Sequence, residues 1–422
     1  MEQKQVIPTG SKETKIGVIP RDWEVKKISD IAYINPKKSI LSEDTKVSFV
    51  AMNDVSSHLR SHTFIIKSAS DVMQGFTSFI NDDVILAKIT PCFENGKVAH
   101  VSNLVNGVGF GSTEFHVLRA KMQTSSMYLY YIVKLDSFRK RCISNMQGSS
   151  GHRRVPKDFI SAYKIQIPEL QEQQKIAKIL STWDRAIEQT QALLEQSKLQ
   201  KKYLMQQLLT GKKRLLDGDE EKFFNDWKEK KLSQVLDVNP KKNIKPQNGY
   251  VSFISMDNLY SSSRKYNSVI KDYDSVSSGF TSFINDDVIL AKITPCFENG
   301  KCIHVNNLEN GIGFGSTEFH ILRAHNENDS TYIYYLVNSY VFRTKCISNM
   351  QGSSGHKRVP KDFICLYKTY IPNFAEQKKI ASVLTTADQE IEQLEKQIEA
   401  YEQEKKYLMQ QLLTGKTRVP LN

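Results

Sequence analysis

The sequence has no long apolar run and few cysteines. In its 422 residues no stretch approaches the roughly 18 consecutive apolar residues of a membrane-spanning helix, and the residues after Met1 lack the apolar core of a signal peptide. The six cysteines form no C-x-x-C pair and no Cys/His pattern with zinc spacing. These absences argue against a membrane-spanning or secreted protein and against a zinc site. They predict free thiols in a reducing cytoplasm.

Sequence motifs of nucleotide-dependent enzymes are also missing. No G-x-x-x-x-G-K-[ST] motif is present, so any use of ATP would fall to a partner. An amino-methyltransferase needs a short Asn/Asp-Pro-Pro-aromatic loop, whereas Asn35-Pro36 and Asn239-Pro240 are followed by lysines. The glycines of residues 107–111 resemble a nucleotide-binding loop, but the strand and helix that should flank it are absent, and tight turns explain them better.

One set of acidic residues deserves a separate test for catalysis. Asp82 and Asp83, followed by Glu94 and Lys97, resemble the carboxylate–lysine spacing of nucleases. A turn that precedes a strand explains the two aspartates equally well, since Asn81 comes directly before them. We favour the turn and predict no catalytic residue and no metal ligand in this chain.

The charge favours an anionic partner. Lys and Arg number 58 against 46 Asp and Glu, which gives a net charge of +12. An excess of this size is typical of proteins that bind nucleic acid, although charge by itself leaves the question open.

The chain contains two copies of one unit. Residues 75–97 recur letter for letter at 279–301, and residues 201–212 recur unaltered at 405–416. Residues 107–120 and 142–160 recur at 311–324 and 346–364 with two substitutions and one substitution. Each pair is offset by 204 residues (75 to 279, 201 to 405), and the register holds without a gap from Trp23 to Lys416.

Each copy divides into a mixed globular part and a long helix. Short apolar or alternating runs at 48–52, 83–89 and 115–118 predict strands, and residues 125–141 predict helix. Pro168 and Pro372 are typical helix starts, with acidic residues in the next turn, and Gly211 and Gly415 are typical stops. We therefore expect an α+β fold, with globular domains over 1–168 and 215–372 and helices over 169–214 and 373–422.

Both predicted helices carry the four–three spacing of a coiled-coil seam. The seam of the first helix is Ile176, Leu180, Trp183, Ile187, Leu194, Leu204 and Leu208, with Thr190, Ser197 and Lys201 at polar positions. The seam of the second is Ile380, Leu384, Ala387, Ile391, Leu394, Ile398, Tyr401, Leu408 and Leu412, with Lys405 at a polar position. A helix of about 38 residues is about 57 Å long, which exceeds the width of a small domain. We therefore favour pairing of the two helices over packing of each seam on its own domain.

Antiparallel pairing of these helices has a consequence for ligand geometry. It would separate two nearly equal globular domains and relate them by an approximate two-fold axis. A DNA duplex has a two-fold axis of its own, so two equal domains match an inverted repeat with a gap between its halves. This step assumes that the partner is DNA.

Several sequence segments, in this order, match a known family. They are residues 19–23 (IPRDW), residues 111–115 (GSTEF), the junctions IP…EQQKIA…IL at 167–180 and IP…EQKKIA…VL at 371–384, and the helix ends LLTGK at 208–212 and 412–416. The match covers nearly the whole chain. The sequence resembles the specificity subunit of type I restriction–modification systems.

The resemblance implies two target-recognition domains, two antiparallel spacer helices and no catalytic site. It implies double-stranded DNA, two methyltransferase subunits and two restriction subunits as partners. The complex would methylate adenine in an interrupted two-part site with S-adenosylmethionine, and would restrict DNA with ATP and Mg²⁺. Two other hypotheses stay open: a stand-alone nuclease or methyltransferase, and a coiled-coil tether with no DNA role.

This chain departs from the usual family pattern, in which the two recognition domains differ. Its two copies are nearly identical, which predicts two equal half-sites in inverted orientation, an interrupted palindrome. Two windows diverge between the copies: residues 39–46 against 243–250, and residues 55–74 against 259–278. If these windows contact bases, the half-sites differ.

Two polar loops in each copy are the candidate DNA contacts. Gln and Asn can pair with adenine, Arg with guanine, and Glu with cytosine, while Lys can hold phosphates. Phosphate contact alone is the alternative for the 147–154 loop, and a hairpin turn around Asn95-Gly96 is the alternative for the 88–97 loop. Glu114 is either structural or base-reading, and we favour a structural role. The predicted residues are Lys88, Thr90, Glu94, Asn95, Lys97, Gln147, Ser149, Ser150, His152, Arg153 and Arg154, with Lys292, Thr294, Glu298, Asn299, Lys301, Gln351, Ser353, Ser354, His356, Lys357 and Arg358 in the second copy.

Overall fold

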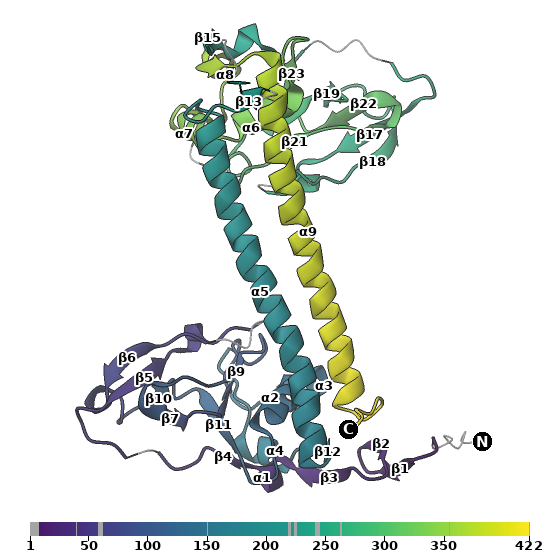
Figure 1. The fold of residues 1–422 in the computed structure, drawn as a ribbon. Coiled ribbons are helices and arrows are strands. Elements are labelled where there is room, and N and C mark those ends of the chain that lie inside the picture. Colours follow the sequence, from purple (N-terminus) through teal and green to yellow (C-terminus); the bar gives the residue numbers. More distant parts are fainter. Residues whose placement is uncertain are drawn as a thin grey trace. The chain divides into compact units, whose positions relative to one another are not determined.

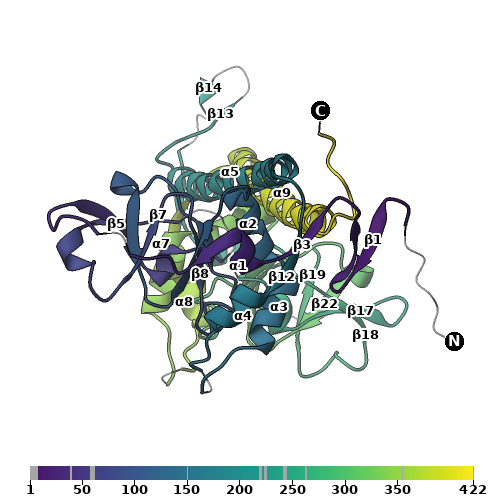
Figure 2. The ribbon, with the colours of Figure 1, turned by 90° about the horizontal axis from the view of Figure 1, so that it is seen from below.

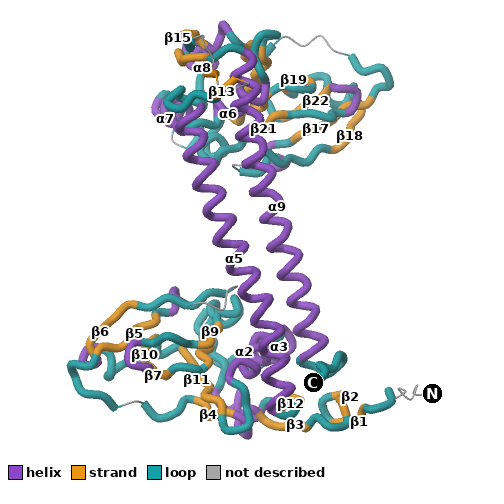
Figure 3. Tube along the Cα trace, in the orientation of Figure 1, coloured by secondary structure: helices purple, strands orange, loops and turns teal. Residues whose placement is uncertain are grey.

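The computed structural model describes residues 8–38, 40–57, 62–149, 151–217, 221–222, 226–240, 245–261, 264–353 and 355–421. Two compact units account for the chain: residues 1–192 with 395–422 form the first, and residues 193–394 form the second. Each unit combines one globular region with a part of α5 (Leu170–Leu208) and a part of α9 (Phe374–Leu412), the two long helices of Figures 1 and 3. Within the described part of the chain, no helix is long and apolar enough to cross a membrane.

The globular region of the first unit is built on two four-stranded sheets. One has the order β6-β5-β10-β7, in which β5 and β10 are parallel, and the other has the antiparallel order β4-β11-β8-β9. A third, two-stranded sheet pairs β3 with β12, beside α1 and α4 (Figure 2). The strands are β1 (Ser11–Thr14), β2 (Gly17–Pro20), β3 (Glu24–Lys27), β4 (Ala32–Ile34), β5 (Lys46–Val50), β6 (Ile65–Ser68), β7 (Thr77–Ile80), β8 (Val84–Ala87), β9 (Val98–His100), β10 (Val108–Gly111), β11 (Phe115–Ala120) and β12 (Lys164–Ile167). The helices are α1 (Ile28–Ile31), α2 (Ser126–Lys134), α3 (Asp136–Ser144) and α4 (Lys157–Ala162).

The second unit repeats this topology. Its sheets have the orders β18-β17-β22-β19, β16-β23-β20-β21 and β15-β24. Its strands are β13 (Leu216–Asp217), β14 (Glu221–Lys222), β15 (Lys228–Lys231), β16 (Leu236–Val238), β17 (Tyr250–Ile254), β18 (Val269–Asp272), β19 (Thr281–Ile284), β20 (Val288–Ala291), β21 (Cys302–His304), β22 (Ile312–Gly315), β23 (Phe319–Ala324) and β24 (Lys368–Ile371). Its helices are α6 (Ser330–Val337), α7 (Tyr340–Ser348) and α8 (Lys361–Leu366). Registers match as well, since Val84 faces Leu118 and Val288 faces Leu322.

The predicted mixed fold is confirmed, but one predicted helix is interrupted. Residues 125–141 form two helices instead of one, because Leu135 has an extended backbone (φ −58°, ψ 135°) between α2 and α3. The matching break in the second unit lies at Ser339, whose side chain caps α7 by accepting a hydrogen bond from the Phe342 backbone N–H. The change of direction at Leu135 allows Phe138 of α3 to reach the core that α2 also fills.

Helix α2 is buried on all sides. Tyr128, Tyr130 and Tyr131 are fully buried in the same core cluster as Trp23 of the globular region and Leu412 of α9. A helix that is apolar all round must have neighbours on every face. The core of the first unit therefore includes the globular region and both long helices, and α6 takes the same place in the second unit.

Seam residues are buried along most of α5, but only near the two ends of α9. Ile176, Leu180, Ile187, Leu194 and Leu208 of α5, with Ile380, Leu384 and Leu412 of α9, are buried, and the other predicted seam residues are half-buried. The indole of Trp183 packs edge-on against the ring of Tyr401 in α9, with 5.6 Å between ring centroids. Ile176 and Leu180 also belong to the core of the first globular region. The seam thus packs on its partner helix and on its own domain together.

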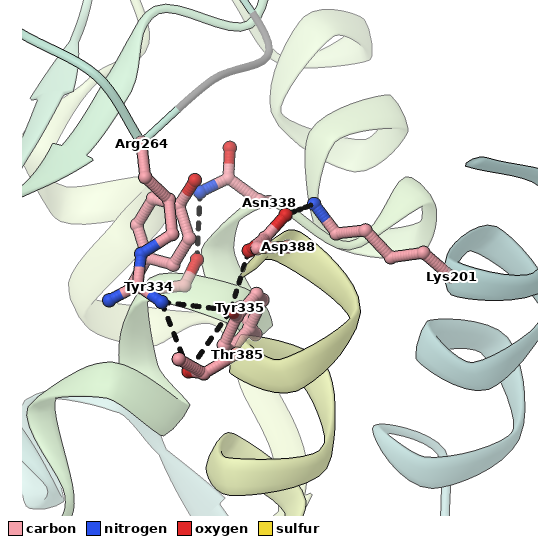
Figure 4. A network of polar contacts seen from close by, with 7 residues as sticks. All are labelled: Lys201, Arg264, Tyr334, Tyr335, Asn338, Thr385 and Asp388. Atoms are coloured by element: carbon pink, nitrogen blue, oxygen red, sulfur yellow. Dashed lines mark hydrogen bonds and ion pairs between the residues drawn. The ribbon is translucent and has the colours of Figure 1, made fainter. Parts of the chain in front are cut away.

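A buried charged contact recurs at one polar seam position of each unit. Asp184 of α5 forms an ion pair with Lys405 of α9 and accepts a hydrogen bond of 2.5 Å from the Tyr131 hydroxyl of α2. In the second unit Asp388 of α9 pairs with Lys201 of α5 and accepts a bond of 2.6 Å from the Tyr335 hydroxyl (Figure 4). Residues early in one helix therefore meet residues late in the other, so the helix segments run antiparallel in both units.

A second contact closes each helix pair at its end. Arg418, beyond the end of α9, donates two hydrogen bonds to Glu172 in the first turn of α5, and the indole N–H of Trp23 donates to the same carboxylate. Arg214 and Trp227 bind Glu376 in the same way in the second unit. Both carboxylates are fully buried, so each depends on these donors.

The buried pair Asp184–Lys405 gives a test of this packing. The variant Asp184→Asn leaves the Lys405 ammonium buried without a counter-charge, and we expect it to lower the free energy of unfolding by about 3–5 kcal/mol. Urea denaturation followed by circular dichroism measures the loss. The double variant Asp184→Asn/Lys405→Met removes both charges, so it should regain much of the stability. Equal stability of the single variant and the wild type would contradict the contact.

Candidate nucleic-acid interface

The two candidate loops of each unit lie side by side. In the first unit the backbone N–H of Val155 donates to the Lys88 carbonyl, and that of Thr90 donates to the Arg153 carbonyl, both at 2.9 Å. Lys292 and Thr294 make the same bonds with Val359 and Lys357 in the second unit. Loops separated by about fifty residues in the sequence thus form one continuous surface, which we call the paired-loop surface (residues 88–97 with 147–154, and 292–301 with 351–358).

In each unit an arginine of the paired-loop surface forms an ion pair with a glutamate outside it. The guanidinium of Arg154 donates to both carboxylate oxygens of Glu114, at 3.0 and 2.8 Å, and Arg358 binds Glu318 at 2.9 and 2.7 Å. These bonds hold the pKa of each carboxyl below its usual range. The Glu114 backbone carbonyl also accepts the Lys88 N–H, at 2.9 Å. The Glu114 carboxylate and its backbone thus support the loop, and contact of Arg154 with a base stays a prediction.

The neighbouring charged residues are also bound within the first unit. Arg153 donates to Glu94 at 3.0 Å, and the Lys97 ammonium donates to the Met52 carbonyl at 2.7 Å. In the second unit Lys301 donates to the Met256 carbonyl at 2.8 Å. Lys357 replaces the arginine there, and its backbone N–H donates to the Thr294 hydroxyl at 3.1 Å. Lys97 and Lys301 therefore stabilise the loop, because each ammonium group is bonded to a backbone carbonyl.

The described exposed positions of the paired-loop surface are polar or glycine, except for Pro91 and Pro295. Asn95, Gln147, Ser149 and His152 are exposed in the first unit, as are Glu298, Asn299, Gln351, Ser353, His356 and Lys357 in the second. Lys88, Thr90, Lys292 and Thr294 are half-buried. Ser150 and Ser354, which we also predicted, lie outside the described residues. The exposed amides and hydroxyls are the groups able to reach base edges, and their role in DNA contact stays a prediction.

Glycine shapes the second loop. Gly148 has φ +123°, and a Cβ there would lie 2.8 Å from the His152 carbonyl oxygen. Gly352 has φ +124°, and a Cβ there would lie 2.8 Å from the His356 carbonyl oxygen. A side chain at either glycine would force the turn open and displace the exposed residues that follow it.

A buried histidine fixes the same turn to the sheet. The His116 ring of β11 bonds through Nε2 to the Val155 carbonyl at 2.8 Å, and its Nδ1 lies 3.2 Å from the Asn35 amide nitrogen. A neutral ring with the proton on Nε2 satisfies both contacts. The Asn35 carbonyl oxygen accepts the Val117 N–H at 2.9 Å. Asn35-Pro36, examined above as a methyltransferase motif, therefore caps the end of β4 against β11.

The nuclease-like residues have structural partners as well. Asp83 is 1% exposed, and both its oxygens accept from Arg119 at 2.8 Å. Glu94 and Lys97 are bound as described above. Among the described residues, no group of three His, Cys, Asp or Glu side chains could hold a metal ion. The turn interpretation of Asp82-Asp83 agrees with these contacts.

Sequence reasoning missed the clamps that hold the surface. Neither Arg154–Glu114 nor Arg119–Asp83 was expected, because partners 40 and 36 residues apart carry no local spacing signal. The sequence did hold one signal for these ion pairs: both members of each pair recur in the second copy, as Arg358–Glu318 and Arg323–Asp287.

A family model matches both copies of the repeated unit. The family described as the type I restriction modification DNA specificity domain matches residues 20–198 and 225–401. The specificity subunit of the Escherichia coli type I restriction enzyme EcoAI is 38% identical over 201 residues, which are 46% of this chain and 34% of that protein. The MjaVIII specificity subunit of Methanocaldococcus jannaschii is 26% identical over 419 residues, 95% of this chain and 94% of that protein. The chain matches only about a third of the length of the EcoAI subunit and of its EcoEI relative.

Solved structures share the fold. A chain from a study titled as the structural basis of complex assembly and conformational transition of the type I R-M system superposes with a TM-score of 0.57 at 15% identity, covering 94% of this chain and 99% of that chain. The type I restriction–modification S subunit from M. genitalium gives 0.55 at 14% identity, covering 93% and 96%.

The buried histidines predict a dependence of stability on pH. Burial lowers the pKa of His320 to about 4 and also lowers that of His116. The unfolded chain takes up this proton near pH 6.5, so the stabilisation is complete above pH 6.5 and is lost as the pH falls toward 4, by about 3 kcal/mol for His320. Urea midpoints between pH 7 and 4.5 should fall more steeply for the wild type than for His320→Gln, whose amide can still donate to the Val359 carbonyl. Identical slopes would contradict this assignment.

Proposed function

This chain belongs to the family of type I restriction–modification specificity subunits, and we propose that it is the DNA-recognition subunit of such a complex, with no catalytic site of its own. The observation that carries the proposal is the paired-loop surface, which occurs twice in equivalent places with the same clamps. A surface that presents amides and hydroxyls on a clamped backbone suits the reading of base edges, while the basic charge of the chain suits phosphate contact.

The catalytic steps belong to partner subunits in this proposal. The candidate carboxylates and lysines of the chain hold one another or the backbone, as the pairs Asp83–Arg119 and Glu94–Arg153 illustrate. Two methyltransferase subunits would bind around the long helices and use S-adenosylmethionine. Two restriction subunits would supply ATP- and Mg²⁺-dependent cleavage. The cytoplasm is the compartment where such a complex meets DNA.

The two recognition domains would read an interrupted palindrome. The paired-loop surfaces differ in a single position, Arg153 against Lys357, so equal base contacts are expected in both halves. Within each unit the two helix segments run antiparallel. Two equal domains joined by antiparallel helices match the two halves of an inverted repeat. The division of the chain into domains 1–168 and 215–372 with helices 169–214 and 373–422 is part of this proposal.

Base-resolution sequencing of adenine methylation tests the function. Co-expression of this chain with its methyltransferase partner should create a new gapped motif, methylated on both strands, that is absent when the chain is omitted. Gln147→Ala should relax one position of one half, and Gln351→Ala the same position of the other half, each at a cost of about 1–3 kcal/mol. The variant Met122→Ala, at an exposed residue outside the paired loops and the long helices, is the control and should leave the motif unchanged. Absence of any motif would refute the proposal.

A half-length fragment tests the two-fold arrangement. Residues 201–212 and 405–416 are identical, so a second copy of residues 1–217 would supply Lys201 for Lys405 and Arg214 for Arg418. The fragment should therefore dimerise through α5, because a single copy would leave Asp184 and Glu172 buried without their partners. Analytical ultracentrifugation measures the mass. The variant Asp184→Asn/Glu172→Gln should weaken the dimer, and a wild-type fragment that stays monomeric at high concentration would refute the arrangement.

A further inference from the structure

The second copy contains a recess in one of its divergent windows. It has a volume of about 530 Å³ and is lined by Tyr260, Arg264, Lys265, Tyr266 and Asn267, with the Asn306-Asn307 turn at its edge. It is an open depression and not an enclosed cavity, so a group bound there stays partly exposed to solvent. The lining contains two phenol rings, two cations and amides, and no carboxylate. Such a lining suits a nucleotide, because a base can stack on an aromatic ring while a cation holds the phosphate.

The segment that forms the recess is held together by its own side chains. The Asn267 amide donates to the Tyr260 hydroxyl at 2.9 Å, and the Tyr266 hydroxyl donates to the Asn306 carbonyl at 2.6 Å. The backbone N–H of Asn267 donates to the Asn258 carbonyl at 3.1 Å. Tyr260 nevertheless keeps 47% of its surface exposed. The recess is thus a built structure with an accessible aromatic face.

Arg264 fixes the recess to the helix frame. Its Nη1 donates to the Tyr335 hydroxyl at 3.2 Å and to the Thr385 hydroxyl of α9 at 3.0 Å (Figure 4). The guanidinium also lies over the ring of Tyr334, 5.6 Å from its centroid. Tyr335 in turn binds Asp388, the partner of Lys201. The recess is therefore preorganised by the same network that registers the two long helices.

Lys265 supplies a positive charge to the lining of the recess. Its ammonium lies 3.8 Å from a carboxylate oxygen of Glu392 on α9, and both side chains remain 40% or more exposed. An ion pair that is this long and this exposed contributes little stability, so a phosphate can compete for the ammonium. The Arg264 guanidinium contacts neutral hydroxyls and an aromatic ring. These contacts involve no carboxylate, so they do not neutralise its positive charge.

A side-chain contact links the paired-loop surface to the segment that carries Tyr260. The Lys301 ammonium, at the end of the 292–301 loop, donates to the carbonyl of Met256, four residues before Tyr260.

The first copy has different residues at the matching positions. Ser56 and Ser61 stand where the second copy has Tyr260 and Lys265, and His62 and Thr63 stand where it has Tyr266 and Asn267. The arginine is retained as Arg60. By sequence, the first copy thus keeps the anchoring residue but lacks the phenol ring and the exposed ammonium.

We propose that this recess binds one nucleotide of the target DNA beside the second half-site, with the phosphate at Lys265 and Arg264 and the base against Tyr260. The proposal rests on the DNA-recognition function. It makes the two nearly identical domains unequal, since only the second gains this contact. The DNA footprint would extend further on one side than the other.

The test replaces two residues of the recess by those of the first copy. The variant Tyr260→Ser/Lys265→Ser is compared with Tyr370→Ser/Lys368→Ser, which removes an exposed tyrosine and an exposed lysine from β24 of the same unit. Each full-length chain is purified with its co-expressed methyltransferase partner. Its affinity for a mixed-sequence duplex of about 40 base pairs is measured at several salt concentrations. Melting curves verify that both variants fold.

The recess variant should bind about tenfold more weakly, as expected for the loss of one stacked base. Its salt dependence should fall by about one phosphate contact. The β24 variant should bind like the wild type. Equal affinity of the recess variant and the wild type, or equal loss in both variants, would overturn the recess but not the DNA-recognition function. A wild-type complex that binds no duplex would overturn both.

Discussion

The buried contact between an aspartate of one long helix and a lysine of the other determines how each unit is assembled. Asp184 is 3% exposed and Lys405 is 11% exposed, and a charge at such depth is tolerated only with its counter-charge and its hydrogen bonds in place. The third partner, Tyr131, belongs to the globular region. The Asp184 carboxylate therefore fixes both the register of the two helix segments and the position of the globular region on them.

The choice of a polar group at a seam position has a cost and a function. An apolar residue at Asp184 and Lys405 would pack at least as well, but it would accept neighbouring registers of the helix pair. A slip of one helical turn moves Lys405 away from Asp184 and leaves both charges buried and unpaired. It also separates Arg418 from Glu172 at the end of the pair. Within each unit this intolerance of slippage keeps the globular region in one position on its helix segments, because Tyr131 and Tyr335 bind the same aspartates.

The sequence predicted the elements of the frame better than the contacts within it. The repeat and the four–three spacing predicted α5 and α9, and their ends fall within two residues of Pro168 and three of Gly211. The spacing located Lys201 and Lys405 in the seam without naming their partners, because a period describes one helix and not the residue opposite. The two candidate loops were found separately. Their pairing through Thr90 and Arg153 depends on the sheet order, which no local pattern encodes. Arg154, predicted to contact DNA, donates to Glu114 in this structure, and its contact with DNA stays a prediction.

The differences between the two copies follow a physical logic. The residues that hold the frame are the same in both: Trp23 and Trp227, Glu172 and Glu376, Asp184 and Asp388. The second divergent window illustrates this. Arg264 lies within it, and the sequence retains an arginine at position 60, while Ser56 and Ser61 stand where the second copy has Tyr260 and Lys265. A loop whose anchor is fixed can change its exposed side chains at little cost in stability, since surface substitutions seldom exceed about 0.5 kcal/mol. Duplication of a whole domain thus yields two recognition surfaces on one frame, and the divergent windows are where they can become unequal.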